Sequence, residues 1–302
     1  MTRHLLTILD LSPKEIVTLL ARATELKDLH HRGQNPAPLT GKTVAMIFDK
    51  PSTRTRVSFE AGIAQLGGAS IYLAPGQTQL SRNEPVADTA KVLSRYVNAV
   101  VVRTFAQATV EDLAGHATIP VINGLTDNHH PCQVLSDLMT IKERFGDFSG
   151  LKVAWVGDGN NMANSWITAA MHLDFPLYLA CPPGYEPDAA LVAQAQKQGA
   201  PVFLGHDPKE AVAGAAVINT DVWASMGQEG EAAARGQVFK PYQVNNELMN
   251  LADPKAIALH CLPAHRGEEI TAEVLDGPQS AAWDQAENRL HFQKALLEWL
   301  LA

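Results

Sequence analysis

The stretch TVAMIFDKPSTRTR, residues 43–56, joins an apolar run to a cluster of hydroxyls and two arginines. Its first six residues, Thr43–Phe48, are apolar or β-branched and predict a buried strand. A helical pattern starts near Ser52 and stops at Gly67 and Gly68. A strand that leads directly into a helix is the first element pair of a parallel α/β fold.

The same alternation of apolar runs and helical patterns continues to the other end of the chain. It predicts an α/β protein with two doubly wound domains, each built on a parallel central sheet. The predicted strands of the first domain are Thr43–Phe48, Ser70–Leu73, Ala99–Val102 and Pro120–Ile122. Those of the second domain are Lys152–Val156, Leu177–Ala180, Val202–Leu204, Ala216–Asn219 and Ala256–Leu259.

The length of the chain supports two domains, because 302 residues exceed the roughly 100–200 residues of a typical domain. We place the first domain at residues 1–145 and the second at residues 150–284, on either side of a charged, glycine-containing stretch. The last segment, residues 285–302, has apolar residues such as Leu296 and Leu300 at helical intervals, so it needs an apolar surface to cover. We expect it to pack back onto the first domain.

Composition and charge exclude several classes of protein. The 24 basic and 32 acidic residues give a net charge of −8, and no basic block could neutralise a nucleic-acid backbone or an anionic membrane. The N-terminus has no signal-peptide pattern and no run of 18 apolar residues occurs, so we expect a cytoplasmic protein. Cys132, Cys181 and Cys261 form no CxxC pair, which fits a reducing compartment.

The start of the helix after Phe48 has the chemistry of an anion-binding site. Ser52 and Thr53 are good N-cap residues, so the free backbone N–H groups of the first turn point beyond the end of the strand. Thr55 adds a further hydroxyl donor, and Arg54 can bind a phosphate with two hydrogen bonds. A capped helix with surface arginines is the alternative interpretation. However, arginines in a first turn oppose the helix dipole, and an anionic ligand would remove that cost.

Two more strands of the first domain end in polar residues. The predicted third strand stops at Arg103, and the fourth leads to His130 and Gln133. Because ligands of parallel sheets gather at the carboxyl ends of the strands, we expect these residues to share one pocket with Arg54. A single loop histidine is more often structural or merely exposed, and this is our interpretation of His129.

Taken together, these residues resemble the aspartate/ornithine carbamoyltransferase family. The family's Ser-Thr-Arg-Thr-Arg motif, followed by Ser-Phe-Glu, stands at residues 52–56 and 58–60. Its His-Pro-x-Gln motif stands at residues 130–133, and its strand-end arginine matches Arg103. The resemblance covers nearly the whole chain. It implies an active site in the cleft between the two domains, with no metal and no organic cofactor.

The motifs of the second domain resemble the ornithine branch of the family. Ser-Met-Gly at residues 225–227 and His-Cys-Leu-Pro at residues 260–263 match this branch. Aspartate-type enzymes have His-Pro-Leu-Pro in place of the second motif, with proline where this chain has Cys261. Residues 157–161 and 287–289 also match. The resemblance implies transfer of the carbamoyl group of carbamoyl phosphate to the δ-amine of ornithine. The products would be citrulline and phosphate, formed by direct attack through a tetrahedral intermediate.

The resemblance also assigns roles to individual residues. It implies that carbamoyl phosphate is bound by Ser52, Thr53, Arg54, Thr55, Gln79, Arg103, His130, Gln133, Cys261, Leu262 and Arg289. It implies that ornithine is bound by Asn161, Asp221, Ser225 and Met226. The catalytic roles fall on Arg54, Arg103, His130 and Cys261. We interpret Cys261 as a polar neighbour of the attacking amine, because the family does not pass through a cysteine adduct.

The chemistry of ornithine agrees with the residues assigned to it. Its α-carboxylate needs amide or backbone donors and its ammonium needs an anion, and Asn161 and Asp221 supply these groups. Without the neighbouring motif, Asp221 could equally be a turn or cap residue. Cys261 by itself would be a buried and inert thiol.

Two other classes of protein remain open from the residues alone. Gly157-x-Gly159 after a strand weakly matches a dinucleotide-binding turn of a dehydrogenase, but Met162 occupies the third glycine position. A non-catalytic phosphate-binding module would not need the amino-acid loop at residues 221–227. Within the family, aspartate, putrescine and acylated ornithines are the rival acceptors, and Asp221 favours a free α-amino group.

The resemblance further implies a homotrimer. In the family, the segment that matches residues 74–85, with Gln79, reaches into the site of the next subunit, which requires a closed head-to-tail ring. Assembly of trimers into larger particles stays open. So does the direction of the metabolism, which can be arginine synthesis or breakdown.

Overall fold

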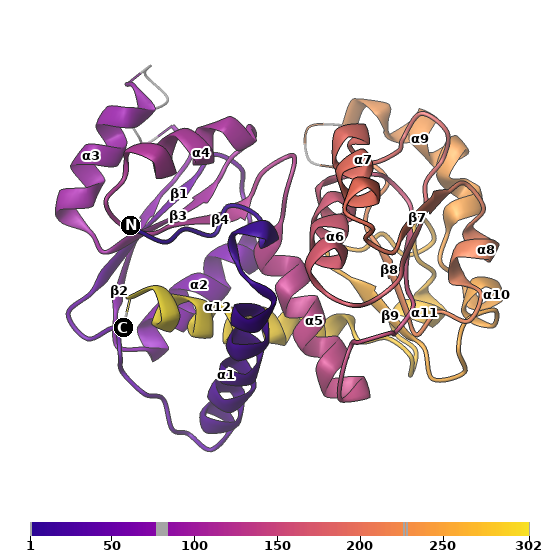
Figure 1. Ribbon diagram of the computed structural model, residues 1–302, viewed down its shortest axis with the longest axis horizontal. Coiled ribbons are helices and arrows are strands. Elements are labelled where there is room, and N and C mark those ends of the chain that lie inside the picture. The colour runs from indigo at the N-terminus through magenta and orange to yellow at the C-terminus, as the bar shows by residue number, and fades with distance from the viewer. Residues whose placement is uncertain (1, 77–83, 226, 228, 302) are drawn as a thin grey trace. The chain divides into compact units, whose positions relative to one another are not determined.

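The computed structural model describes residues 2–76, 84–225, 227 and 229–301. The chain divides into two compact units, one formed by residues up to Met139 together with those from Glu287 onward, the other by Thr140–Ala286. Each unit is a parallel sheet covered by helices (Figure 1). The predicted α/β fold is therefore confirmed. Within the described residues, no helix is both long and apolar enough to cross a membrane.

The first unit is built on a sheet with the strand order β2-β1-β3-β4. Its strands are β1 (Thr43–Phe48), β2 (Ala69–Leu73), β3 (Ala99–Arg103) and β4 (Val121–Leu125). Its helices are α1 (Pro13–His31), α2 (Thr53–Gln65), α3 (Val86–Tyr96), α4 (Gln107–His116) and the first part of α5 (Pro131–Phe145), with a 3-10 turn at Ile8–Asp10. Val100 and Val102 on β3 pack with Ala90 of α3 and Leu113 of α4, so these helices cover one face of the sheet.

Strand β4 is longer than the sequence predicts. The predicted strand covers Pro120–Ile122, but β4 runs from Val121 to Leu125 and includes Asn123 and Gly124, which are poor strand residues. Asn123 is fully buried, and its side-chain amide donates to the carbonyl oxygen of Leu6 at 2.9 Å. Its backbone N–H donates to the carbonyl of Leu5 at 2.7 Å. The N-terminal segment therefore supplies the polar partners that a sequence pattern does not reveal.

Helix α12 (Ala282–Leu301) ends in the first unit. Glu298 accepts two hydrogen bonds from Arg22 of α1, at 2.7 and 2.8 Å. Lys294 is buried and donates to Gln65 of α2 at 3.1 Å. The C-terminal helix is thus held to α1 and α2 by polar contacts as well as by its apolar face, and Figure 1 shows it beside both.

The second unit is built on a parallel sheet with the strand order β7-β6-β5-β8-β9. Its strands are β5 (Val153–Val156), β6 (Leu177–Ala180), β7 (Val202–Gly205), β8 (Val217–Thr220) and β9 (Ile257–His260). Its helices are α6 (Asn161–His172), α7 (Ala189–Lys197), α8 (Pro208–Val212), α9 (Ala232–Phe239), α10 (Asn246–Met249) and α11 (Ala272–Leu275), with 3-10 turns at Glu229–Glu231 and Lys240–Tyr242. One core joins Ala154 and Ile218 of the sheet to Val212, Leu248 and Leu275 of α8, α10 and α11.

Each sheet has a point at which the strand order reverses. Strand β1 has β2 on one side and β3 on the other, and β5 lies in the same way between β6 and β8. Open parallel sheets bind ligands outside the carboxyl ends of their strands at such points. In the first unit this position is flanked by Ser52 and Arg103, and in the second by Asn160 and Asp221. The fold thus brings most of the predicted polar residues to one end of each sheet.

Candidate active site

The N-terminus of α2 forms the centre of the first half-site. Ser52 is its N-cap, with extended backbone, and its hydroxyl accepts a hydrogen bond from the Thr55 N–H at 3.2 Å. The hydroxyl oxygen of Thr55 is buried and accepts a hydrogen bond from Arg289 Nη2 at 2.6 Å. The first backbone N–H groups of an α-helix have no acceptor within the helix itself. This arrangement suits an anion.

The two arginines of this turn have different surroundings. The Arg56 guanidinium lies 3.6 Å above the ring of Tyr72, and its Nε lies 3.1 Å from Glu60. Arg54 is half-buried, and its charge acts on the buried imidazole of His130. The charge of Arg54 therefore acts on His130, whereas Arg56 contacts Tyr72 and Glu60.

The charges of three guanidinium groups act on His130. Burial is the main cause that lowers the pKa of His130 well below 6.5, and the charges of Arg289, Arg103 and Arg54 lower it further. Three arginines, from α12, β3 and α2, therefore act on one buried imidazole at the start of α5. A concentration of positive charge around a neutral side chain is a suitable environment for a dianion and for a carbonyl oxygen that gains charge.

Gln133, in the first turn of α5, supplies a hydrogen-bond acceptor. Its amide nitrogen donates to Asp137 at 2.9 Å, which orients the side chain. Its buried amide oxygen has no hydrogen-bond partner among the described residues, and a buried acceptor of this kind calls for a ligand or water. The neighbouring Cys132 is fully buried, and burial raises the pKa of its thiol to about 12. Cys132 is therefore an inert thiol at neutral pH.

Asp221 is the centre of the second half-site. It follows β8, is 7% exposed, and accepts a hydrogen bond from the side-chain amide of Asn160 at 2.9 Å. The thiol of Cys261, which follows β9, donates to the other carboxylate oxygen at 3.0 Å. A buried carboxylate held by three neutral donors, the Asn160 amide, the Cys261 thiol and the backbone N–H of Val222, is suited to a ligand ammonium group.

The segment after β9 is held in an unusual backbone conformation. Leu262 has φ of 61°, in the left-handed region that a γ-branched residue seldom adopts. Its N–H donates to His260 Nδ1 at 2.9 Å, and His260 Nε2 lies 3.1 Å from the buried Glu269 carboxylate. Such strain persists where surrounding contacts enforce it, and it concentrates at functional sites. This conformation positions Cys261 beside Asp221.

The remaining predicted residues are placed as follows. Asn161 is the first residue of α6 and Ser225 is half-buried in the segment after β8. Gln79 and Met226 lie outside the described residues. The structure brings Thr55, Arg54, Arg103, His130 and Arg289 together in the first unit, and Asp221 and Cys261 together in the second.

Sequence reasoning missed two groups in the second unit. Asn160, rather than Asn161, caps α6 and contacts Asp221. An asparagine before a helical pattern is a recognisable N-cap signal that could have identified it. Arg235 was also missed: its guanidinium pairs with Asp158 at 3.1 Å and donates to the carbonyl of Trp223 at 2.8 Å. No local pattern indicates that contact.

Asp158 gives a prediction for stability. Burial raises its pKa from 3.8 to about 6, although the Arg235 charge opposes the shift. The folded state therefore binds this proton more tightly than the unfolded state. The contribution of Asp158 to the free energy of unfolding is greatest below pH ~4 and falls by up to about 3 kcal/mol as the pH rises to ~6.

Urea unfolding at several pH values between 4 and 7 would measure this contribution. The Asp158→Asn variant should lack that part of the slope, because it has no proton to lose. The same pH slope in both proteins would show that Asp158 is ionised with an ordinary pKa in the folded state.

The glycines after β5 contact the protein's own backbone. A Cβ on Gly159 would lie 2.2 Å from the carbonyl carbon of Glu186, and the Gly159 N–H donates to the Tyr185 carbonyl at 2.8 Å. In a dinucleotide-binding turn, the corresponding glycine lets the backbone approach a pyrophosphate. Here the backbone of Glu186 occupies the space next to Gly159, which argues against the dehydrogenase interpretation.

Comparison with known families defines the class of protein. Residues 3–143 match the carbamoyl-P binding domain of aspartate/ornithine carbamoyltransferase. Residues 149–300 match the Asp/Orn binding domain of the same proteins. The two matches span most of the chain, which therefore belongs to the aspartate/ornithine carbamoyltransferase family.

Individual relatives point to one branch of the family. The chain is 58% identical over 302 residues to the ornithine carbamoyltransferase of Desulfotalea psychrophila, covering 100% of both proteins. It is 56% identical over 299 residues to the anabolic ornithine carbamoyltransferase of Pseudomonas aeruginosa, covering 99% of this chain and 97% of that protein. The solved structure of ornithine carbamoyltransferase from Pyrococcus furiosus matches with a TM-score of 0.94 and 52% identity, covering 98% of this chain and 96% of that one. That from Thermus thermophilus matches with a TM-score of 0.90 and 44% identity, covering 100% of both.

Proposed function

We propose that this chain transfers the carbamoyl group of carbamoyl phosphate to the δ-amine of L-ornithine and releases L-citrulline and phosphate. The observation that carries the proposal is the capped N-terminus of α2, where Arg289 contacts Thr55, together with the three arginines whose charges act on buried His130. This set matches the charge of an acyl phosphate. The identities of 56% and 58% to ornithine carbamoyltransferases over nearly the full length support ornithine as the acceptor.

The first unit binds carbamoyl phosphate in this proposal. Backbone N–H groups at the start of α2, the hydroxyls of Ser52, Thr53 and Thr55, and Arg54 hold the phosphate. The amide oxygen of Gln133, which has no hydrogen-bond partner among the residues that the structure describes, accepts a hydrogen bond from the carbamoyl NH₂ group. Arg103, at the end of β3, donates a hydrogen bond to the carbamoyl carbonyl oxygen. Arg289, which is positioned by its hydrogen bond to Thr55, contacts the same carbonyl group.

His130 acts as a neutral hydrogen-bond donor rather than as a charged acid. Because burial and the three arginines hold its pKa well below 6.5, it is unprotonated at neutral pH. A neutral imidazole still has one N–H, which can donate to the carbamoyl oxygen as negative charge develops there. The arginines supply positive charge, and the His130 N–H supplies a hydrogen bond in a defined direction.

The second unit binds ornithine. Asp221, held by Asn160 and Cys261, accepts the α-ammonium group. Amide and backbone donors near Asn161 and the Ser225–Met226 loop receive the α-carboxylate. Putrescine has no α-ammonium group and acylated ornithines have a neutral α-amide, so neither forms this ion pair with Asp221. The carboxylate therefore favours free ornithine over those acceptors. Cys261 and Leu262 lie beside the reacting amine in this assignment.

The chemical step uses only these side chains and the two substrates. The neutral δ-amine attacks the carbonyl carbon, the C–N bond forms, and the carbonyl electron pair moves to oxygen. When the carbonyl re-forms, the C–O bond to phosphate breaks and the phosphate leaves with that pair. The proton from nitrogen passes to the departing phosphate. One well-placed donor to such an oxyanion contributes about 3 kcal/mol of barrier lowering, and holding both substrates in line contributes a further part.

Ser52 offers a test of the phosphate site with a matched control. Ser52→Ala and Ser12→Ala each remove the side-chain cap of a helix in the same unit, α2 and α1 respectively. Each should lower the free energy of unfolding by about 1 kcal/mol. Only Ser52→Ala should also weaken carbamoyl phosphate binding, measured by calorimetry. Equal binding by the two variants would mean that Ser52 is a cap and nothing more.

Assembly and location are further parts of the proposal. We assign the carbamoyl phosphate-binding role to residues 1–145 with the C-terminal helix, and the ornithine-binding role to residues 150–284. We propose a cytoplasmic homotrimer with Gln79 serving the adjacent subunit's site, in line with the family resemblance, and with neither nucleic acid nor membrane as a partner. The anabolic relative from Pseudomonas aeruginosa favours a role in arginine biosynthesis. Sedimentation equilibrium would distinguish a trimer from other assemblies.

A further inference from the structure

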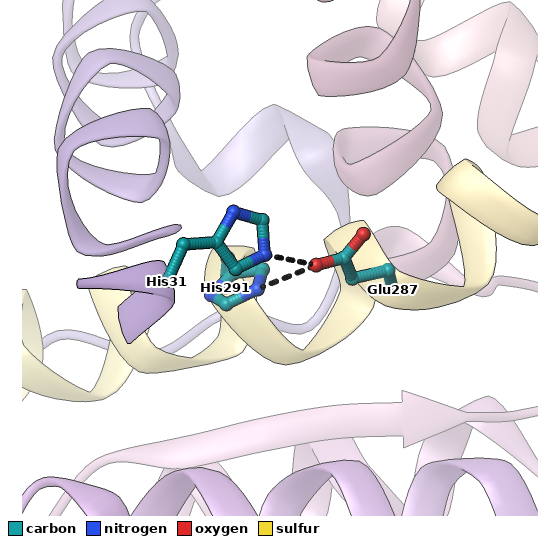
Figure 2. A group of neighbouring side chains, drawn as sticks. All are labelled: His31, Glu287 and His291. Atoms are coloured by element: carbon teal, nitrogen blue, oxygen red, sulfur yellow. Dashed lines mark hydrogen bonds and ion pairs between the residues drawn. The ribbon is translucent and has the colours of Figure 1, made fainter. Parts of the chain in front are cut away.

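Three possible metal ligands outside the proposed active site meet where α1 and α12 come together. Figure 2 shows His31, the last residue of α1, pointing with His291 toward one carboxylate oxygen of Glu287. His31 Nε2 lies 2.8 Å from Glu287 Oε1, and His291 Nε2 lies 3.5 Å from the same oxygen. One nitrogen or oxygen from each residue lies within 4.8 Å of the other two. We propose that these three residues form a binding site for a divalent transition metal of the zinc type.

The spacing of the ligands fits such an ion. Glu287 and His291 are four residues apart on α12, so their side chains project from the same face of the helix. Zinc bonds of about 2.0–2.1 Å in a tetrahedron place neighbouring ligand atoms about 3.3 Å apart. The observed separations of 2.8 and 3.5 Å lie on either side of this value, so rotation of the His31 and Glu287 side chains could adjust them.

The environment of His291 suits a metal ligand. The side chain is fully buried, and neither ring nitrogen forms a hydrogen bond within the described part of the chain. Buried polar atoms without partners are uncommon, and each calls for an explanation. A buried imidazole in this state is suited to bind a metal ion through one of its ring nitrogens.

The two carboxylate oxygens of Glu287 have different neighbours. Lys27 Nζ lies 3.7 Å from Oε2, whereas both histidines approach Oε1. Lys27 also donates to Asn288 Oδ1 at 2.7 Å, which holds its charge on that side. The other nearby cation, Lys294, donates to Asn35 and Gln65. Oε1 is thus available to an ion while Oε2 keeps its contact with Lys27.

The ligand set indicates the class of metal. Two imidazoles and one carboxylate suit Zn²⁺, Ni²⁺, Co²⁺ and Cu²⁺ better than Ca²⁺ or Mg²⁺, which prefer oxygen ligands. The side chains of His31 and Glu287 are 54% and 39% exposed, so an ion can enter from solvent and keep water as its fourth ligand. A bound ion would join the end of α1 to the helix that carries Arg289, and would stabilise the folded unit.

Metal binding to the full-length protein tests this site directly. We expect added Zn²⁺ to raise the thermal unfolding midpoint, and added Co²⁺ to give the visible absorption of a tetrahedral ion with nitrogen and oxygen ligands. His31→Gln, which changes an exposed side chain and keeps an amide near Glu287, should weaken Zn²⁺ binding at least about 100-fold in calorimetry, because outer-sphere changes alone produce 10–100-fold losses. His116→Gln is the matched control. His116 is an exposed helix-end histidine that pairs with Asp112 four residues earlier.

A second group of possible ligands, Asp221, His260 and Cys261, could also take up metal. A thiolate ligand adds a charge-transfer band in the near ultraviolet, which separates the two sites in the Co²⁺ spectrum. Anomalous diffraction from Zn²⁺-soaked crystals should place the ion between His31, Glu287 and His291. Unchanged affinity in His31→Gln, a thiolate band that accounts for all bound Co²⁺, or no binding at millimolar Zn²⁺ would each overturn the proposal. Metal at the first group would stand whatever the outcome of the citrulline assay.

Discussion

Replacing Arg54 with alanine is expected to lower kcat/KM for carbamoyl phosphate by about 100- to 1000-fold, the loss that follows removal of one oxyanion-site donor. Arg54 is in the first turn of α2, and its charge reaches His130 together with those of Arg103 and Arg289. Its removal takes away the bidentate partner of the leaving phosphate. Steady-state assays of citrulline formation would measure the loss, and circular dichroism would check that the variant is folded.

The Arg56→Ala variant is the matched control for Arg54→Ala. It removes a second arginine side chain from the start of α2, one whose guanidinium contacts Tyr72 and Glu60. Loss of those exposed contacts should reduce stability by less than about 1 kcal/mol and change activity by less than about tenfold. If Arg54→Ala retains citrulline formation within about tenfold of the parent, a loss under ~1.4 kcal/mol, the assignment of Arg54 to the leaving group is wrong.

Replacing Asp221 with asparagine is expected to lower kcat/KM for ornithine by at least about 30-fold, or about 2 kcal/mol, the lower end of the cost of removing one partner of a buried charge pair. Asparagine keeps the size of the side chain and an oxygen that can accept from Asn160, so the change is chiefly one of charge. The carbamoyl phosphate half-site lies in the other unit, and its affinity in calorimetry should stay within about twofold of the parent.

Asp188→Asn provides a comparison for Asp221→Asn within the same unit. Asp188 caps α7, and asparagine is an equally good cap, so this variant loses a charge without losing the cap. It should use ornithine as the parent does. Equal weakening of both substrates by Asp221→Asn would identify Asp221 as a structural turn residue instead.

Much of the fold could be predicted from the sequence because most of its strands are buried on both faces. Such strands read as short continuous apolar runs, and the bounds of β1 and β6 match the predicted ranges. Strand β4 was predicted too short because the partners of Asn123 come from Leu5 and Leu6, more than 110 residues earlier. Polar partners that are distant in sequence leave no local pattern.

The residues of the candidate site were predictable to different degrees. The cap at Ser52 and the strand-end position of Arg103 follow from local rules, and the structure has both. The different surroundings of Arg54 and Arg56 depend on Tyr72 from another strand, which no helix rule identifies. In the same way, the contact of Asn160 with Asp221 joins residues 61 positions apart. The tertiary fold decides which of several suitable side chains meet.

A panel of acceptors incubated with carbamoyl phosphate would test the central claim most directly. L-ornithine, L-aspartate, putrescine and N-acetylornithine would be compared, with each carbamoylated product identified by mass spectrometry and phosphate release measured alongside. We predict that ornithine gives citrulline and phosphate in equal amounts, and that the other three acceptors react at least about 100-fold more slowly. Putrescine and N-acetylornithine offer no α-ammonium group to the buried Asp221, and aspartate brings an added carboxylate. Equal or faster carbamoylation of any other acceptor, or phosphate release without citrulline, would contradict the account.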